Sequence, residues 1–169
     1  MKLSRVERWI LSNQCRILGK LFPEAAKQWK GAEEILDAGY EPHYEAIAHH
    51  VCAETMSQEQ CEEITEILEM FLALNRAMEL ITDRSRIYQH ALTFNGFSSK
   101  DEPRALAYAE FLCRHDSARF KDLHIHEFDS HSAMMGTYRI LLREWRSSKD
   151  KHKLNKDDVV RITNSVRNS

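Results

Sequence analysis

Residues 57–80 read SQEQCEEITEILEMFLALNRAMEL, and this stretch decides the fold class. Ser57 and Gln60 have the spacing of a capping box, which is typical of a helix start. Glutamates dominate the first half, whereas the second half is apolar on most sides. The stretch therefore predicts one long helix that starts in water and ends in the core of an all-α domain.

The first 39 residues predict a helical hairpin. From residue 3 to residue 21 the apolar side chains recur every three or four positions, which places them in one stripe along a helix: Leu3, Val6, Trp9, Ile10, Ile17, Leu18 and Leu21. Asn13 falls on this stripe, which indicates a core asparagine or, as the alternative, a ligand contact. A second helix opens with Pro23 in its first turn and stops at Gly39, which can take the left-handed cap.

The remaining segments also read as helices and turns. TFNGF at 93–97 is interpreted as an interhelix turn in which Gly96 supplies a positive φ. Pro103 marks the first turn of another helix, and Asn155 is a candidate cap for the last one. The prediction is an all-α fold of about six to eight helices, with the hairpin packed on a larger multi-helix domain. Residues 1–169 form a single compact unit, with a possible division into 1–39 and 40–169.

Composition narrows the class of protein. With 43% hydrophobic and 30% charged residues, the chain fits neither a disordered nor a fibrous protein. We find no apolar run of signal-peptide or membrane-spanning length. The four cysteines contain no C-x-x-C pair, which favours reduced thiols. We therefore expect a cytoplasmic protein with no membrane contact.

The densest cluster of metal-ligating residue types is HIHEFDSH at 124–131. Its histidines, His124, His126 and His131, do not have the four-residue spacing of the helical zinc motif. Asp129, Ser130 and Ser132 would suit the cap of the following helix. The histidines remain metal candidates, but the sequence predicts no metal and no cofactor.

A second, dispersed set resembles the ligand order of helical metal-dependent phosphohydrolases. It comprises His49, His50, His115, Asp116, Asp150 and either Asp157 or Asp158. His115 and Asp116 are its main metal candidates, and a metal-dependent hydrolase is the alternative function that they support. Because no nucleophile motif, dinucleotide fingerprint or phosphate loop is present, a non-enzymatic protein is favoured.

Asn75 and Arg76 interrupt the most apolar helix. Such an arginine usually pairs with an acid or reaches the surface, but it could also line a pocket for a carboxylate or phosphate ligand. The glutamates at the start of the same helix form either a solvated face or a docking surface for a basic partner, such as the tail of another subunit. Both alternatives stay open.

Charge is unevenly distributed along the chain. Residues 1–142 carry 16 basic and 22 acidic side chains, whereas residues 143–169 carry 8 basic and 4 acidic ones. A basic tail can contact nucleic acid. The tail shows no interleaved aromatic residues, so nucleic-acid contact is a disfavoured alternative.

Five motifs, in order along most of the chain, resemble the bacterial YfbU family: RWILSNQ at 8–14, ILDAGY at 35–40, ILEMFLAL at 67–74, FNGF at 94–97 and HEFDSHSAMM at 126–135. The resemblance implies an all-α fold with a helical hairpin and a larger helical domain, in a cytoplasmic bacterial protein. It implies no activity, since the family has no established catalytic or binding residues.

Together these observations predict a non-enzymatic, cytoplasmic helical module for binding or regulation. We expect a homo-oligomer with a small-molecule or protein ligand, and with Asn75 and Arg76 as the candidate pocket residues.

Overall fold

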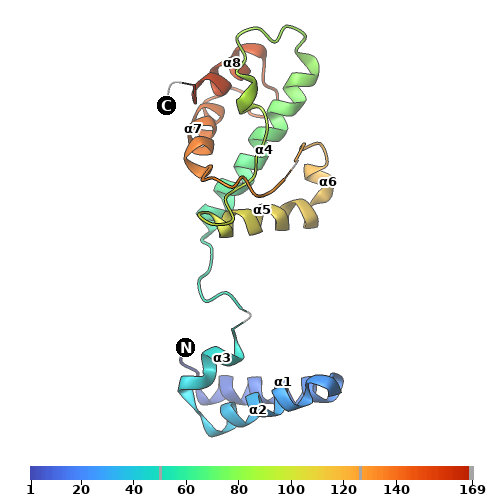
Figure 1. The fold of residues 1–169 in the computed structure, drawn as a ribbon, viewed down its shortest axis with the longest axis vertical. Coiled ribbons are helices and arrows are strands. Elements are labelled where there is room, and N and C mark those ends of the chain that lie inside the picture. Colours follow the sequence, from blue (N-terminus) through green and yellow to red (C-terminus); the bar gives the residue numbers. More distant parts are fainter. Residues whose placement is uncertain (50, 126, 168–169) are drawn as a thin grey trace. The chain divides into compact units, whose positions relative to one another are not determined.

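The chain is all-α, as predicted. A computed structural model describes residues 1–49, 51–125 and 127–167. These residues form eight α-helices and three short 3-10 turns, and the strand-like pairing among them is limited to two isolated β-bridges. The chain divides into two compact units, Met1–Thr55 (unit 1) and Met56–Ser169 (unit 2) (Figure 1). Among the described helices, none is both long enough and apolar enough to cross a bilayer.

Unit 1 is a helical hairpin followed by one short helix. Its elements are α1 (Arg5–Leu21), η1 (Pro23–Ala25), α2 (Ala26–Ala38), η2 (Glu41–His43) and α3 (Tyr44–Ile47). Ser4 and Glu7 form a capping box at the start of α1. Gly39 ends α2 in the left-handed conformation with φ +77°, as predicted. α1 and α2 lie side by side along their length.

The boundary between the units lies later than the sequence indicated. The sequence predicted one compact unit with a possible division after residue 39, and in the structure the hairpin unit extends to Thr55. Tyr44 explains the difference, because its side chain is buried with Cys15, Ala32 and Leu36 in the core of unit 1. The segment that follows α2 therefore belongs to the hairpin.

Unit 2 is built around α4. Its elements are α4 (Gln58–Leu80), η3 (Gln89–Ala91), α5 (Pro103–His115), α6 (Ser117–Phe120), α7 (Met135–Arg146) and α8 (Lys156–Asn164). α4 contacts α5, α6, α7 and α8. Ser57 and Gln60 form the predicted capping box, and the buried residues of α4 begin at Ile64. The long helix therefore starts exposed and continues through the core, as its sequence predicts.

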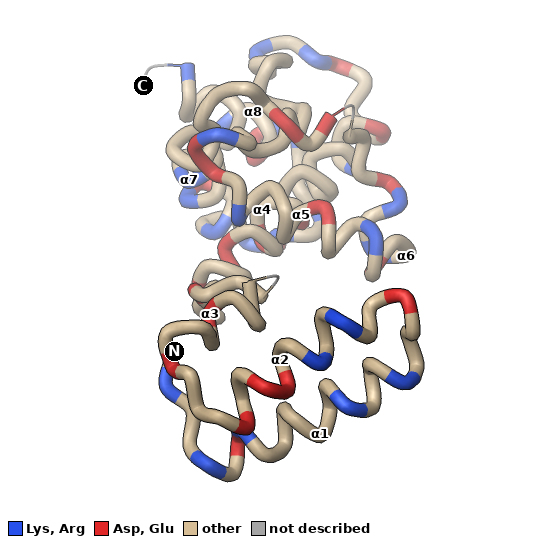
Figure 2. Tube along the Cα trace, turned by 60° about the horizontal axis from the view of Figure 1, so that its bottom comes forward, with Lys and Arg blue, Asp and Glu red and all other residues tan. Residues whose placement is uncertain are grey.

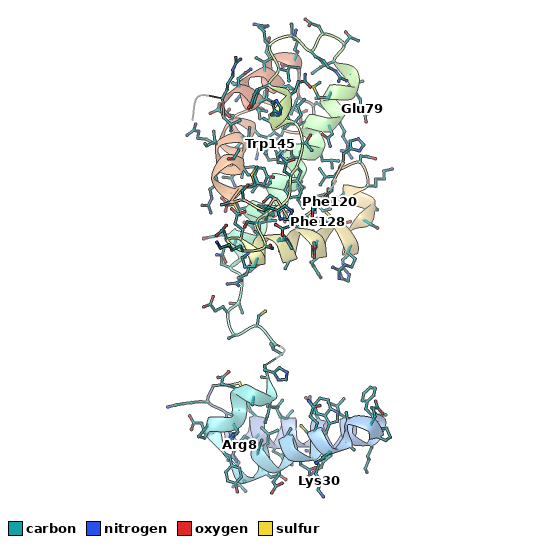
Figure 3. All side chains as sticks on the ribbon, viewed as in Figure 1. Arg8, Lys30, Glu79, Phe120, Phe128 and Trp145 are labelled. Atoms are coloured by element: carbon teal, nitrogen blue, oxygen red, sulfur yellow. The ribbon has the colours of Figure 1, made fainter. Side chains whose placement is uncertain are left out.

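An aromatic cluster joins α4 to the turn at 93–97 and to α7. Phe71, Phe94, Phe97 and Tyr138 are all buried, and neighbouring ring centroids lie 5.2–5.6 Å apart. Tilted and edge-on contacts of this kind stabilise a core beyond simple burial. Trp145, further along α7, is also buried, and its Nε1 donates to the Lys151 carbonyl at 2.9 Å (Figure 3).

Gly96 lets the turn at 93–97 approach the segment before α7. Its φ is +84°, and a Cβ at this position would lie 2.0 Å from the Phe128 carbonyl oxygen. That oxygen accepts from the Phe97 N–H at 2.8 Å. The Tyr138 hydroxyl donates to the Gly96 carbonyl and accepts from the Asn95 N–H, both at 3.0 Å. Burial raises the pKa of Tyr138, so the hydroxyl keeps its proton as a donor.

Helix capping differs from the sequence prediction at one end. Asp129, Ser130 and Ser132 were expected to cap α7, but none of them does, and that prediction is wrong. The Glu102 carboxylate, at the start of α5, accepts from the Met134 and Met135 N–H groups at 3.0 and 2.7 Å instead. A negative charge at this end also suits the helix dipole. The predicted cap of α8 is confirmed, since Asn155 forms a capping box with Asp158.

We expect Gly96→Ala to destabilise unit 2 by about 3 kcal/mol or more, because it adds a positive-φ strain and a clash with the Phe128 carbonyl. Gly136→Ala is the matched control in the same unit. It lies in α7 with nothing within 4 Å of the added Cβ, so it should be neutral or stabilising by up to about 1 kcal/mol. Urea unfolding of the two variants measures the difference, and equal effects would contradict the assigned role of Gly96.

Candidate functional site

The HIHEFDSH segment lies between α6 and α7, against the turn at 93–97. The Ser130 N–H donates to the Phe97 carbonyl at 3.2 Å, and the Phe97 N–H donates back to Phe128. Isolated bridges pair Phe94 with Ile125 and Phe97 with Asp129. The segment is therefore held by backbone hydrogen bonds, and its polar side chains lie around this pairing.

The histidines of this segment do not converge in the described structure. His124 is exposed and borders a hollow on α4. His131 is also exposed, with φ +54°, and its ring nitrogens lie 3.6 Å from Glu127 and 3.5 Å from Asp129. His126 lies outside the described residues. Within the described part of the chain, no group of three or more His, Cys, Asp or Glu side chains could hold a metal ion.

Asp129 supports the loop around it. Its carboxylate accepts from the Ser99 N–H at 3.1 Å and from the His131 N–H at 2.9 Å. Hydrogen bonds from the Ser99 side chain, and then from the backbone of His131 and Ser99, lower the pKa of Asp129 to about 2. The carboxylate is thus ionised at neutral pH and ties two loops together.

The dispersed set has structural roles as well. The His115 ring packs on Phe111, with centroids 4.5 Å apart, at the end of α5. Asp116 is the N-cap residue immediately before α6, and its carboxylate lies 3.7 Å from the Arg119 guanidinium. Asp150 accepts hydrogen bonds from the loop amides of His152 and Lys153. Asp157 lies 3.8 Å from the Arg86 guanidinium, and Asp158 takes part in the capping box of α8. His49 belongs to unit 1, and His50 lies outside the described residues.

Asn75 and Arg76 line different hollows of unit 2. Asn75 is half-buried and borders a hollow of about 430 Å³ with Glu79, Arg84 and His124. Glu79 lies at the far end of α4 (Figure 3). Arg76 borders a separate hollow of about 250 Å³ and lies 3.3 Å from Asp122 in an exposed ion pair. Adjacent residues of a helix point about 100° apart, so the two side chains do not share one pocket.

A hollow of about 440 Å³ was not anticipated from the sequence. It lies beside the aromatic cluster and the start of α7, and its lining includes Tyr88, His90, Asn95, Thr137 and Tyr138. Its residues come from four separate stretches of the chain. No local spacing could have revealed it, although the FNGF turn that supplies one wall was recognised.

The acidic row at the start of α4 is paired within its own unit. Glu63 accepts two hydrogen bonds from Arg139, both at 2.8 Å. Glu66 pairs with Arg146, and Glu69 pairs with Arg119. These three glutamates therefore bind basic side chains of the same chain, which lowers the negative charge that they could offer to the basic tail of a partner.

The basic tail is also engaged in ion pairs. Lys151 lies 3.6 Å from Glu66, Lys156 pairs with Asp83, and Arg161 lies 3.2 Å from both Glu144 and Asp158. Arg161 also donates to the hydroxyls of Ser147 and Ser148. These cations balance acids nearby, which removes much of the positive field that would attract nucleic acid.

The apolar stripe of α1 faces solvent, not the core of unit 1. Five of its seven members are exposed, and they form the surface named here the α1 face: Val6 (63% exposed), Trp9 (65%), Ile10 (46%), Ile17 (57%) and Leu21 (66%). Asn13 lies among them, half-buried, with its Oδ1 3.4 Å from an Arg16 nitrogen. The interpretation of Asn13 as a core residue is therefore wrong.

The opposite side of α1 contacts α2 through a different set of residues. Ser12 and Cys15 are buried there, and the Ser12 hydroxyl donates to Asp37 at 2.6 Å. Arg16 reaches Glu33 and Asp37 at 2.7 and 2.9 Å. Arg8 donates to the Leu36 carbonyl at 3.1 Å. The spacing of residues 8, 12, 15 and 16 marks a second helical stripe, which was the sequence signal for the true hairpin interface.

The YfbU domain family matches residues 1–165 of the chain. The chain belongs to this family. A UPF0304 protein of Actinobacillus succinogenes is 27% identical over 166 residues, which cover 98% of this chain and 100% of the relative. The YfbU domain thus spans both compact units, so the α1 face and the hollows of unit 2 lie within one family domain.

In this YfbU domain we expect Asp129→Asn to lower stability in a pH-dependent way. The folded-state pKa of Asp129, about 2, lies below the ordinary value of about 3.9, so the ionised group stabilises the fold above that value. The contribution is lost as pH falls toward 2. Urea midpoints of wild type and variant should therefore differ most above pH ~4 and converge at lower pH; a constant difference would contradict the role given to this carboxylate.

Proposed function

We propose that the protein is a non-enzymatic, cytoplasmic helical binding module that works as a homo-oligomer. The α1 face supports this proposal most directly. Monomeric proteins seldom leave a continuous row of large apolar side chains in water. The polar clusters that first suggested catalysis are engaged in caps, loop hydrogen bonds and ion pairs. Association is therefore the property that best accounts for the unusual surface of the chain.

The same module is proposed to bind a small polar ligand or a protein group in unit 2. The hollow beside Asn75 combines an amide, the Arg84 guanidinium and the His124 imidazole with one carboxylate, that of Glu79. The amide, the guanidinium and the imidazole donate hydrogen bonds to carboxylate or phosphate oxygens. The hollow beside Arg76 is smaller, and Asp122 already faces that guanidinium. Asn75 is thus the stronger of the two candidate contacts.

The two alternative functions gain less support. A metal-dependent hydrolase needs a retained divalent ion held by converging ligands, whereas His124 and His131 have different neighbours in the described structure. Nucleic-acid contact through residues 143–169 would draw on Arg146, Lys151 and Arg161, which face acids of the same unit.

We predict that Ile17→Glu converts the wild-type oligomer to monomer at micromolar concentration, because association would bury an uncompensated carboxylate. The weakening should reach at least about tenfold in Kd. Leu80→Glu is the matched control, because Leu80 is 85% exposed and belongs to unit 2, so it is not part of the α1 face. Native mass spectrometry and sedimentation of untagged protein report the subunit number. A monomeric wild type, or equal effects of the two variants, would contradict the proposed association.

For the ligand hollow, inorganic phosphate and succinate serve as probes of the two oxyanion classes. We expect either probe to raise the melting temperature of the wild type, and Asn75→Ala to reduce that rise at least about twofold. Arg76→Ala should leave it nearly unchanged and cost at most about 1 kcal/mol of stability, as for an exposed ion pair. Probe responses that are absent in wild type, or equal in wild type and Asn75→Ala, would remove the support for this hollow.

A further inference from the structure

Exposed large apolar side chains are concentrated in unit 1. Among the described residues, unit 2 contributes Leu80 and Phe111 to this class, and unit 1 contributes Met1, Val6, Trp9, Ile10, Ile17, Leu21, Phe22, Tyr40 and Val51. Phe111 is already stacked between Tyr108 and His115. The apolar surface that best matches the α1 face is therefore another α1 face, on a second copy of the chain.

The size of the surface fits a pair of identical chains. The exposed parts of the α1 face together with Phe22 amount to roughly 600 Å², which approaches the ~800 Å² that each partner buries in a stable complex. The centre of the surface carries no charge. Residues 9–15 read WILSNQC, with no charged residue, and this stretch of α1 is drawn in tan in Figure 2.

The stripe has nearly the same spacing in both directions from Asn13. Ile10 lies three residues before it and Ile17 four residues after it, while Val6 lies seven before and Leu21 eight after. If two copies of α1 run in opposite directions, Ile10 meets Ile17 and Val6 meets Leu21 of the second copy. An antiparallel pair also opposes the helix dipoles.

On this geometry we propose that the α1 helices of two chains pack antiparallel through the α1 face, with Asn13 beside the two-fold axis, which the pairs 10/17 and 6/21 place between residues 13 and 14. This inference rests on the association proposed above and specifies its surface, direction and register. A residue beside a two-fold axis lies next to its own copy. The Asn13 side chain carries both a donor and an acceptor, so its amide can hydrogen-bond to the same amide of the partner. A single polar residue in an apolar seam fixes register and orientation.

Cysteine cross-linking in the full-length chain tests direction and register. The background replaces Cys52, Cys61 and Cys113 with serine, because these free thiols are exposed or half-buried whereas Cys15 is buried. Three variants are oxidised under the same conditions: Asn13→Cys, Val6→Cys, and the double variant Val6→Cys with Leu21→Cys. All of these positions are exposed or half-buried, so the hairpin should fold in each variant, which circular dichroism verifies.

We expect Asn13→Cys and the double variant to form disulfide-linked dimers at least about tenfold faster than Val6→Cys alone. In the antiparallel pair, the two copies of residue 6 lie roughly 20 Å apart at 1.5 Å per residue. A disulfide needs Cα atoms within about 7 Å. Residues 6 and 21 of one helix are also too far apart to link within a chain.

Two results would overturn the inference while leaving oligomerisation intact. Rapid linkage of Val6→Cys alone would indicate parallel helices, and slow linkage of all three variants in an oligomeric protein would indicate that another surface associates. A monomeric background protein, shown by sedimentation before oxidation, would instead overturn the association itself. The proposed function and the proposed geometry therefore fail in distinguishable ways.

Discussion

The packing of Phe71 against Phe94 and Tyr138 is the contact on which unit 2 depends. Phe71 lies in the buried half of α4, and its ring contacts both Phe94 of the turn at 93–97 and Tyr138 of α7, whose rings also contact each other. The Tyr138 hydroxyl then fixes the backbone of Asn95 and Gly96 by accepting and donating one hydrogen bond each. The buried rings and the two hydrogen bonds of the Tyr138 hydroxyl thus hold α4, the turn at 93–97 and α7 against one another.

Ion pairs on the surface of unit 2 add to the stability that its apolar core provides. Glu63, Glu66 and Glu69 follow one another along α4 and meet arginines from α7 and α6. Each exposed pair contributes little by itself, about 1 kcal/mol at most. Glu66 meets two residues of the basic tail, Arg146 and Lys151, so part of the positive charge of that tail is neutralised on the surface of the same unit.

Local features of the fold could be predicted from sequence. The capping boxes at Ser57 and Asn155 and the positive φ of Gly39 and Gly96 depend on residues within a few positions. Features that depend on contacts between residues far apart in the sequence could not be predicted. Glu102 caps a helix that begins more than thirty residues later, and the buried side of α1 is set by Asp37 and Glu33 on α2. For the site, Asn75 and Arg76 were recognised as unusual, but periodicity alone does not say which hollow each side chain enters.

The core of unit 1 is small. Its buried apolar residues are Cys15, Ala32, Leu36 and Tyr44, whereas the cluster in unit 2 has more than twenty. A unit of about 55 residues buries a modest fraction of its surface and is only marginally stable alone. When a partner binds the folded form alone, stability rises with its concentration. Covering the α1 face with a second copy would thus make the folding of the hairpin depend on how much of the protein the cell contains.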